Sequence, residues 1–176
     1  MNRREAIEKI TLMLGGVIAA PLMAGAMGER LNFGPSLNVS ADQEALLAEI
    51  ADVIIPTTGT PGAKAAGVEK FIVRVVRDCY QLDEQKKFYD GVSKLDKDSQ
   101  EVYQKSFVTL DATQKKDMVT RATKSDKPFF IQMKGLTVTG YFTSEIGATQ
   151  ALDYLPIPGR FDGSWPLPKG QKSWAI

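Results

Sequence analysis

Apolar residues recur every three or four positions between residues 40 and 151, which is the spacing of amphipathic helices. The expected helices cover 40–55, 68–79 and about 83–96, then a short helix with Tyr103 and Phe107, and two more that begin near 111 and near 126. No strand-like alternation exceeds four residues, and the chain has no internal repeat. The pattern predicts an all-α protein, a small helical bundle over residues 40–151.

Capping residues place the starts of several of these helices. Ser40 with Gln43, and Asp111 with Gln114, have the spacing of capping boxes, in which side chain and backbone satisfy each other's hydrogen bonds. Pro56 ends the first helix, because the residue before a proline avoids the helical conformation.

The sulfur-containing residues of the bundle lie on apolar helix faces. Cys79 continues a stripe that includes Ile72 and Val75, which predicts a buried thiol. Met118 and Met133 occupy similar positions on later helices and are predicted core residues rather than ligands.

Residues 139–150 alternate small residues and hydroxyls around one carboxylate. Gly140 and Gly147 permit the close approach of another backbone. One interpretation is a helix corner with Ser144 as the cap of a short second helix, and the other is a docking surface for a larger protein. The docking candidates here are Tyr141, Glu145 and Gln150.

The last segment, residues 152–176, is an extended tail of different composition. It holds four of the nine prolines and both tryptophans. Prolines keep a backbone extended, but disordered tails are poor in aromatic residues. The aromatic rings therefore lie either along the chain's own bundle or on a partner protein, where such side chains are favoured anchors. The docking candidates in the tail are Tyr154, Arg160, Phe161, Trp165 and Trp174.

The first 26 residues have the parts of an export signal. Arg3 and Arg4 precede an uncharged run over residues 10–27 that contains Gly and Pro, with small residues at 24–26. Adjacent arginines and a glycine-diluted apolar run favour the twin-arginine route, which carries folded proteins. A permanent anchor is the alternative, since 18 residues approach the roughly 20 that span a bilayer, and a helix buried in the domain is a third.

These segments give the expected organisation of the chain. It is a twin-arginine signal over 1–26, a linker over 27–39, the bundle, and the tail. The expected location is the periplasm, with membrane association through a partner protein or through an N-terminal segment that is not cleaved.

Composition excludes the enzymatic mechanisms and metal sites that need histidine or several cysteines. With no histidine and one cysteine, the chain has no Ser-His or Cys-His couple, no His ligand for haem, no internal disulfide and no Cys-rich zinc site. The segment 59–64 lacks the Lys-Ser/Thr end of a phosphate loop, and the carboxylates at 96–101 lack the central glycine of a calcium loop. We therefore expect no catalytic residue, metal site or cofactor site in this chain.

The charge balance excludes strongly charged partners. The net charge is +1, and removal of residues 1–26 leaves 19 basic and 19 acidic groups. No nucleic-acid partner is therefore expected.

Four stretches in this order resemble one protein family: residues 47–58 (LAEIADVIIPTT), 60–68 (TPGAKAAGV), 140–148 (GYFTSEIGA) and 158–161 (PGRF). The chain resembles the gluconate 2-dehydrogenase subunit 3 family over about residues 40–174. The resemblance implies a non-catalytic small subunit of a periplasmic FAD-dependent sugar or polyol dehydrogenase. A stand-alone periplasmic binding or structural protein is the alternative.

The resemblance also implies partners and a cofactor outside this chain. The large subunit of such complexes is a flavoprotein of the glucose-methanol-choline type, and a cytochrome c usually accepts the electrons. The small subunit carries the export signal and is thought to help the flavoprotein mature and cross the membrane through the twin-arginine translocase. Relatives often have a cysteine near 161–164, where this chain has Ser164, so a disulfide from the tail to the helix of Cys79 is in doubt.

Overall fold

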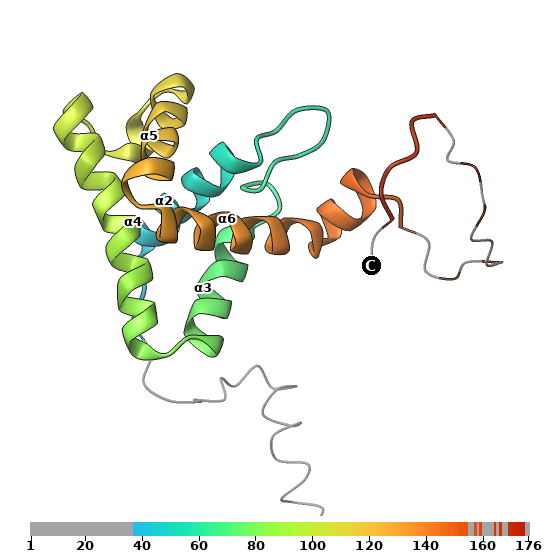
Figure 1. Ribbon diagram of the computed structural model, residues 1–176, viewed down its shortest axis with the longest axis horizontal. Coiled ribbons are helices and arrows are strands. Elements are labelled where there is room, and N and C mark those ends of the chain that lie inside the picture. Colours follow the sequence, from blue (N-terminus) through green and yellow to red (C-terminus); the bar gives the residue numbers. More distant parts are fainter. Residues whose placement is uncertain are drawn as a thin grey trace, which may run out of the picture. The chain divides into compact units, whose positions relative to one another are not determined.

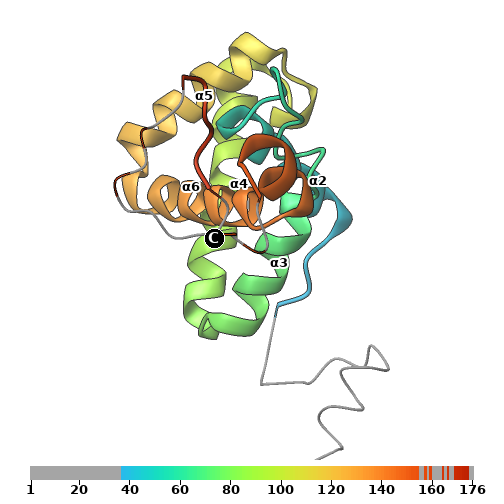
Figure 2. The same cartoon turned by 90° about the vertical axis from the view of Figure 1, so that its right-hand side faces the viewer.

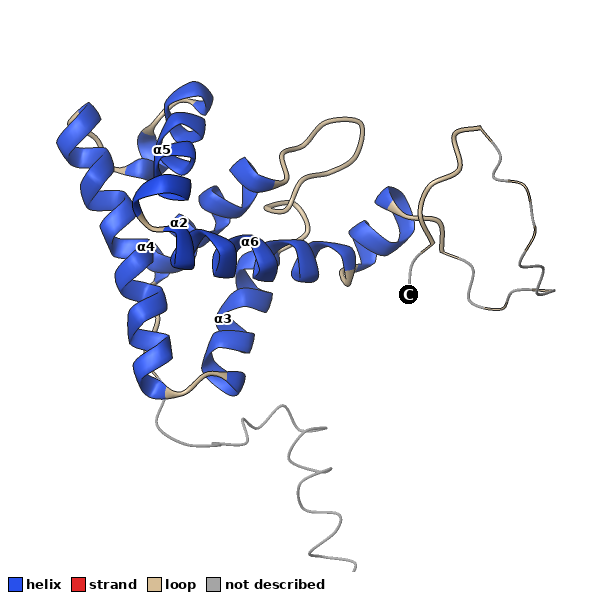
Figure 3. Ribbon diagram, viewed as in Figure 1, coloured by secondary structure: helices blue, strands red, loops and turns tan. Residues whose placement is uncertain are grey.

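The computed structural model describes residues 37–154 and, in the tail, residues 157, 159, 164, 166 and 169–174. In these residues the regular elements are helices, which confirms the all-α prediction (Figure 3). The elements are α2 (Ala41–Ile54), α3 (Val68–Cys79), α4 (Leu82–Tyr103), the 3₁₀ turn η1 (Phe107–Thr109), α5 (Ala112–Ser125), α6 (Lys127–Phe142) and the π-helical turn η2 (Gly147–Ala151). The predicted signal and most of the linker, with Arg3 and Arg4, lie outside the described residues.

Local capping fixes the helix starts as predicted. Ser40 Oγ accepts a hydrogen bond from the Gln43 N–H at 3.2 Å, and the Gln43 side chain accepts one from the Ser40 N–H at 3.1 Å. Asp111 and Gln114 form the same reciprocal pair at the start of α5. Both predicted capping boxes are therefore confirmed.

The core is arranged around α2, which contacts α3, α4, α5 and α6 (Figures 1 and 2). Leu47 of α2, Val92 of α4 and Met133 of α6 are fully buried, and Met118 of α5 is 3% exposed. The prediction that both methionines are core residues is confirmed. α6 crosses α3 and leads to η2 and the tail (Figure 1).

The third helix is longer than predicted. α4 continues past residue 96 to Tyr103, so the expected short helix with Tyr103 does not exist as a separate element. Its buried face continues through Leu95 to Ser99, which is tolerated inside because Ser99 Oγ donates to the Leu95 carbonyl at 2.8 Å. The Asp96 carboxylate then accepts from the Phe107 N–H at 2.8 Å, which fixes η1 beside α4.

The prediction of a buried thiol is wrong, because Cys79 is exposed. The buried residues of α3 are Val68, Ile72 and Val76, which are four residues apart. Cys79 is the last residue of α3 and follows Val76, the last buried residue of the helix. The apolar spacing therefore continues into a turn of α3 that is not buried.

One ionic cluster connects three parts of the bundle. Glu49 of α2 bonds Lys115 of α5 at 2.7 Å and also bonds Lys64 of the loop between α2 and α3. The side chains of Glu49 and Lys115 are 15% and 14% exposed, whereas that of Lys64 is 54% exposed. Burial raises the pKa of Glu49, but the two lysines outweigh burial and the pKa lies below its usual value.

None of the described helices combines the length and the apolarity that a membrane span requires.

Candidate docking surface

The segment 139–150 forms a helix corner at the end of α6. Ser144 Oγ donates to the Tyr141 carbonyl at 2.6 Å and accepts from the Gly147 N–H at 3.0 Å, so Ser144 caps the short helical turn that follows. Thr143 Oγ1 donates to the carbonyl four residues earlier at 2.7 Å. The predicted corner is confirmed, and these hydroxyls serve the backbone rather than a ligand.

The two glycines of this corner are needed inside the chain. A Cβ at Gly140 would lie 2.6 Å from a ring carbon of Phe71, where α6 crosses α3, and a Cβ at Gly147 would overlap the Tyr141 carbonyl. The close approach that glycine allows is therefore made by this chain's own atoms. No partner protein is therefore needed to explain either glycine.

Tyr141 was a candidate for docking, but it is a core residue. Its side chain is 2% exposed, and its hydroxyl donates to the Pro61 carbonyl at 2.7 Å and lies 3.4 Å from Thr60 Oγ1. The ring faces inward because Tyr141 follows Met133 and Thr137 at four-residue spacing on the buried face of α6. Tyr141 therefore anchors the α2–α3 loop to α6 instead of presenting its ring to a partner.

The other described candidates lie on the surface around η2 and the end of the tail. The side chains of Glu145 and Gln150 are exposed, and Tyr154 and Trp174 are 59% and 55% exposed. The Asp153 N–H donates to the Ser173 carbonyl at 2.9 Å, and a parallel bridge joins Asp153 to Trp174.

This bridge brings the end of the tail beside the end of η2 (Figure 1). The Lys172 ammonium also donates to the Gln150 carbonyl. Arg160, Phe161 and Trp165 lie outside the described residues, so the structure brings together Gln150, Tyr154 and Trp174 of the predicted set.

Sequence reasoning missed an apolar face on the outside of α6. Ile131, Val138 and Phe142 are 58%, 36% and 39% exposed. Together with Gly135, which is also exposed, they recur at three- and four-residue spacing along the helix. We call these four residues the α6 outer face.

The composition of α6 indicates that it has a second apolar face. Only two of its 16 residues carry a charge, Lys127 and Lys134, and apolar residues occupy more positions than one helix face can hold. The apolar spacing predicted Met133 as a core residue, which is correct, but it did not explain the additional apolar residues of this helix. A helix that is apolar on all sides is normally covered on all sides.

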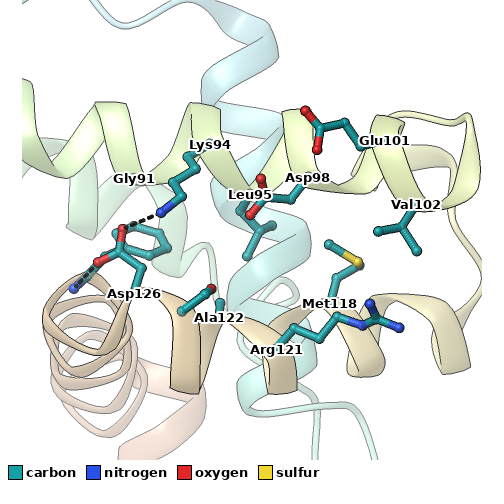
Figure 4. Close-up of a pocket in the computed structure, with 12 residues that line it drawn as sticks. Gly91, Lys94, Leu95, Asp98, Glu101, Val102, Met118, Arg121, Ala122 and Asp126 are labelled. Atoms are coloured by element: carbon teal, nitrogen blue, oxygen red, sulfur yellow. Dashed lines mark hydrogen bonds and ion pairs between the residues drawn. The ribbon is translucent and has the colours of Figure 1, made fainter.

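The described residues also form a hollow of about 220 Å³ between α4 and α5 (Figure 4). Leu95 and Met118 line it together with charged side chains of both signs, among them Asp98 and Arg121. Clefts that bind small ligands are larger, roughly 300–1,000 Å³. Among the described residues no group of three or more acidic or cysteine side chains is placed to hold a metal ion.

One tyrosine hydroxyl in the core has no hydrogen-bond partner among the described residues. Tyr89 of α4 is 6% exposed, and burial raises its pKa to about 12, with a smaller contribution from Glu44. A raised phenol pKa makes this group a poorer proton donor, so it has no evident catalytic use.

The comparisons with known proteins agree with an interaction role. The family model for gluconate 2-dehydrogenase subunit 3 matches residues 41–159, which is more than half of the chain. Neither the curated proteins nor the solved structures include a significant match. The matched region runs from the first residue of α2 through α6, the corner and η2 into the tail. The chain therefore belongs to the gluconate 2-dehydrogenase subunit 3 family.

Proposed function

We propose that this chain is the non-catalytic small subunit of a periplasmic FAD-dependent sugar dehydrogenase, and that it assists maturation and twin-arginine export of the flavoprotein subunit. The observation that carries the proposal is the family match over residues 41–159. Members of this family are accessory subunits that associate with the catalytic subunit of a dehydrogenase complex.

The chemistry of the chain supports a division of labour between subunits. Flavoproteins of the glucose-methanol-choline type typically use a catalytic histidine, and this sequence contains none. The hollow between α4 and α5 is smaller than a cleft for a small ligand and has charged side chains of both signs around it. The proposal therefore assigns FAD and the catalytic base to the partner, and the electrons pass from there to an acceptor such as a cytochrome c.

The N-terminal sequence supports the export role. Arg3 and Arg4 stand before an apolar run diluted by glycine, which favours the twin-arginine translocase. Because this route carries folded proteins, a flavoprotein that is bound to the folded bundle would cross the membrane with it. One signal would then serve two chains.

The export role is tested by expressing a glucose-methanol-choline type flavoprotein from the source organism with and without this chain. The readouts are dehydrogenase activity and FAD in the periplasmic fraction. We expect both only when this chain is present, and we expect Arg3→Lys with Arg4→Lys to abolish them while total flavoprotein is unchanged. Full export and activity without this chain would contradict the proposal and would favour the stand-alone binding or structural protein.

A further inference from the structure

We infer that the α6 outer face is the surface on which the catalytic dehydrogenase subunit docks. This inference rests on the proposed function and adds to it the place of contact. It follows from the exposure of this face, from a glycine that the fold does not need, and from the size and charge of the face.

The first observation is that this apolar face is uncovered in the described part of the chain. Ile131, Val138 and Phe142 are all more than a third exposed, and they follow one another along a single side of α6. The outer side of α5 differs, because Lys116, Arg121 and other polar residues occupy it. Single exposed apolar residues are ordinary, whereas contiguous exposed patches, especially those with polar residues at the rim, mark sites of protein interaction.

The second observation is Gly135, in the interior of α6. A Cβ there would meet no atom within 4 Å, whereas a Cβ at Gly91 or Gly140 would collide with Phe129 or Phe71. Glycine in a helix interior is less stable than alanine, and no contact within the described chain explains it at this position. A partner that approaches the helix backbone closely at Gly135 accounts for the missing side chain.

The size of the face favours a large partner over a second copy of this chain. The face runs from Ile131 to Phe142, which is 12 residues, so it is roughly 18 Å long at 1.5 Å per residue and about 10 Å wide, which gives about 180 Å². Two such faces would bury about 360 Å², whereas stable interfaces bury roughly 1,200–2,000 Å². A larger protein that also covers exposed residues beyond α6, such as Tyr154 and Trp174, reaches that range more readily.

The charge of the face indicates the chemistry of the partner surface. The charged residues of α6 are Lys127 and Lys134, and the helix has no carboxylate. The matching surface on the catalytic subunit is therefore apolar, with a carboxylate placed opposite Lys134.

The test uses the full-length tagged chain co-expressed with a glucose-methanol-choline type flavoprotein from the source organism, and measures how much flavoprotein and FAD is recovered on the tag. Val138→Glu and Ile131→Glu should each reduce recovery at least tenfold. The matched control is Val102→Glu, since Val102 is a helical valine of similar exposure on α4, 44% against 36%. The control should retain recovery within twofold of wild type.

Gly135→Ala provides a second measurement, in which stability and binding move in opposite directions. It should raise the melting temperature of the isolated chain by roughly 2–4 °C and still lower flavoprotein recovery severalfold. A glycine with a purely internal role would not give this combination. Circular dichroism of each variant keeps loss of folding separate from loss of binding.

The outcomes separate this inference from the proposed function. Failure of the wild-type chain to retain the flavoprotein overturns the proposed function and, with it, the inference. Wild-type recovery with folded Val138→Glu and Ile131→Glu overturns the α6 outer face alone, as does an equal loss with Val102→Glu. A wild-type dimer that Val138→Glu converts to a monomer without loss of flavoprotein would assign the face to a second copy instead.

Discussion

Removal of the Glu49 charge is expected to be among the most destabilising surface-accessible changes in the bundle. Glu49→Gln removes two ion pairs. The Lys64 side chain is already 54% exposed, so water solvates it in the variant, and the loss of this ion pair costs about 0–1 kcal/mol. Lys115 is only 14% exposed, and its 2.7 Å bond to a carboxylate is replaced by at most a bond to a neutral amide oxygen. The bond to the charged group that is lost is worth about 1.5–3 kcal/mol. We expect a total loss of about 1.5–4 kcal/mol in the free energy of unfolding.

The assay is urea unfolding of the full chain at pH 7 and at successively lower pH. The pKa of Glu49 is lowered in the folded state, so its contribution is fully present above the ordinary value of 4.5 and is lost as the pH falls through the lower, folded value. The difference between wild type and Glu49→Gln should therefore be largest near neutral pH and should shrink below about pH 4.

Two controls locate the effect within the cluster. Glu101→Gln changes an exposed glutamate of α4 and should alter stability by less than about 0.5 kcal/mol. Lys115→Met should show a strong coupling to Glu49→Gln in a double-mutant cycle, and Lys64→Met a weak one. A Glu49→Gln loss below about 0.5 kcal/mol, or a stronger coupling to Lys64 than to Lys115, would refute this reasoning.

Three further changes test individual contacts. Tyr141→Phe leaves the Pro61 carbonyl without its 2.7 Å donor and should cost about 1–2 kcal/mol by urea unfolding; no measurable cost would show that the loop is held without this bond. Tyr89→Phe removes a buried hydroxyl that has no partner in the described structure, so it should be neutral or stabilising in the same assay, and a clear destabilisation would reveal an unseen partner. A chain that ends at Asp153 keeps η2 and should melt within about 3 °C of wild type while losing flavoprotein in co-purification; unfolding on truncation would assign the tail to the core.

Much of the bundle could be predicted from the sequence because the signals that specify it are local. Helix starts depend on pairs three residues apart, such as Ser40 with Gln43, and the structure contains both predicted capping boxes. The inner face of α6 likewise follows from spacing alone. These features depend on residues close together in the sequence and not on contacts between distant elements.

The errors arise where tertiary packing decides the outcome. Cys79 has apolar spacing, but the chain leaves the helix before anything covers it. α4 was predicted to end near residue 96, but the rest of the bundle covers its next turn as far as Ser99, and the helix continues to Tyr103. Apolar periodicity does not show which turns of a helix are covered by a neighbouring element. That coverage determines both the exposure of Cys79 and the length of α4.

The sequence predicted only in part which residues near the end of α6 are exposed, and the reason is again physical. Aromatic and polar residues at 139–154 were docking candidates because of their residue type. Tyr141 is nevertheless buried, and the two glycines are needed because other atoms of this chain pack against them. The α6 outer face was missed because its aliphatic residues are indistinguishable by type from core residues. Only the structure shows that no other part of the described bundle covers them.

The central claim is that this chain binds a dehydrogenase flavoprotein and performs no redox chemistry itself. The most direct test is to purify the complex, separate the two subunits, and measure flavin absorbance and sugar-dependent dye reduction in each fraction and in the recombined sample. The account predicts that flavin and activity stay with the large subunit, and that the α6 outer face variant Val138→Glu fails to rejoin it. Flavin or activity in the fraction of this chain alone, or two subunits that never form a complex, would contradict the account.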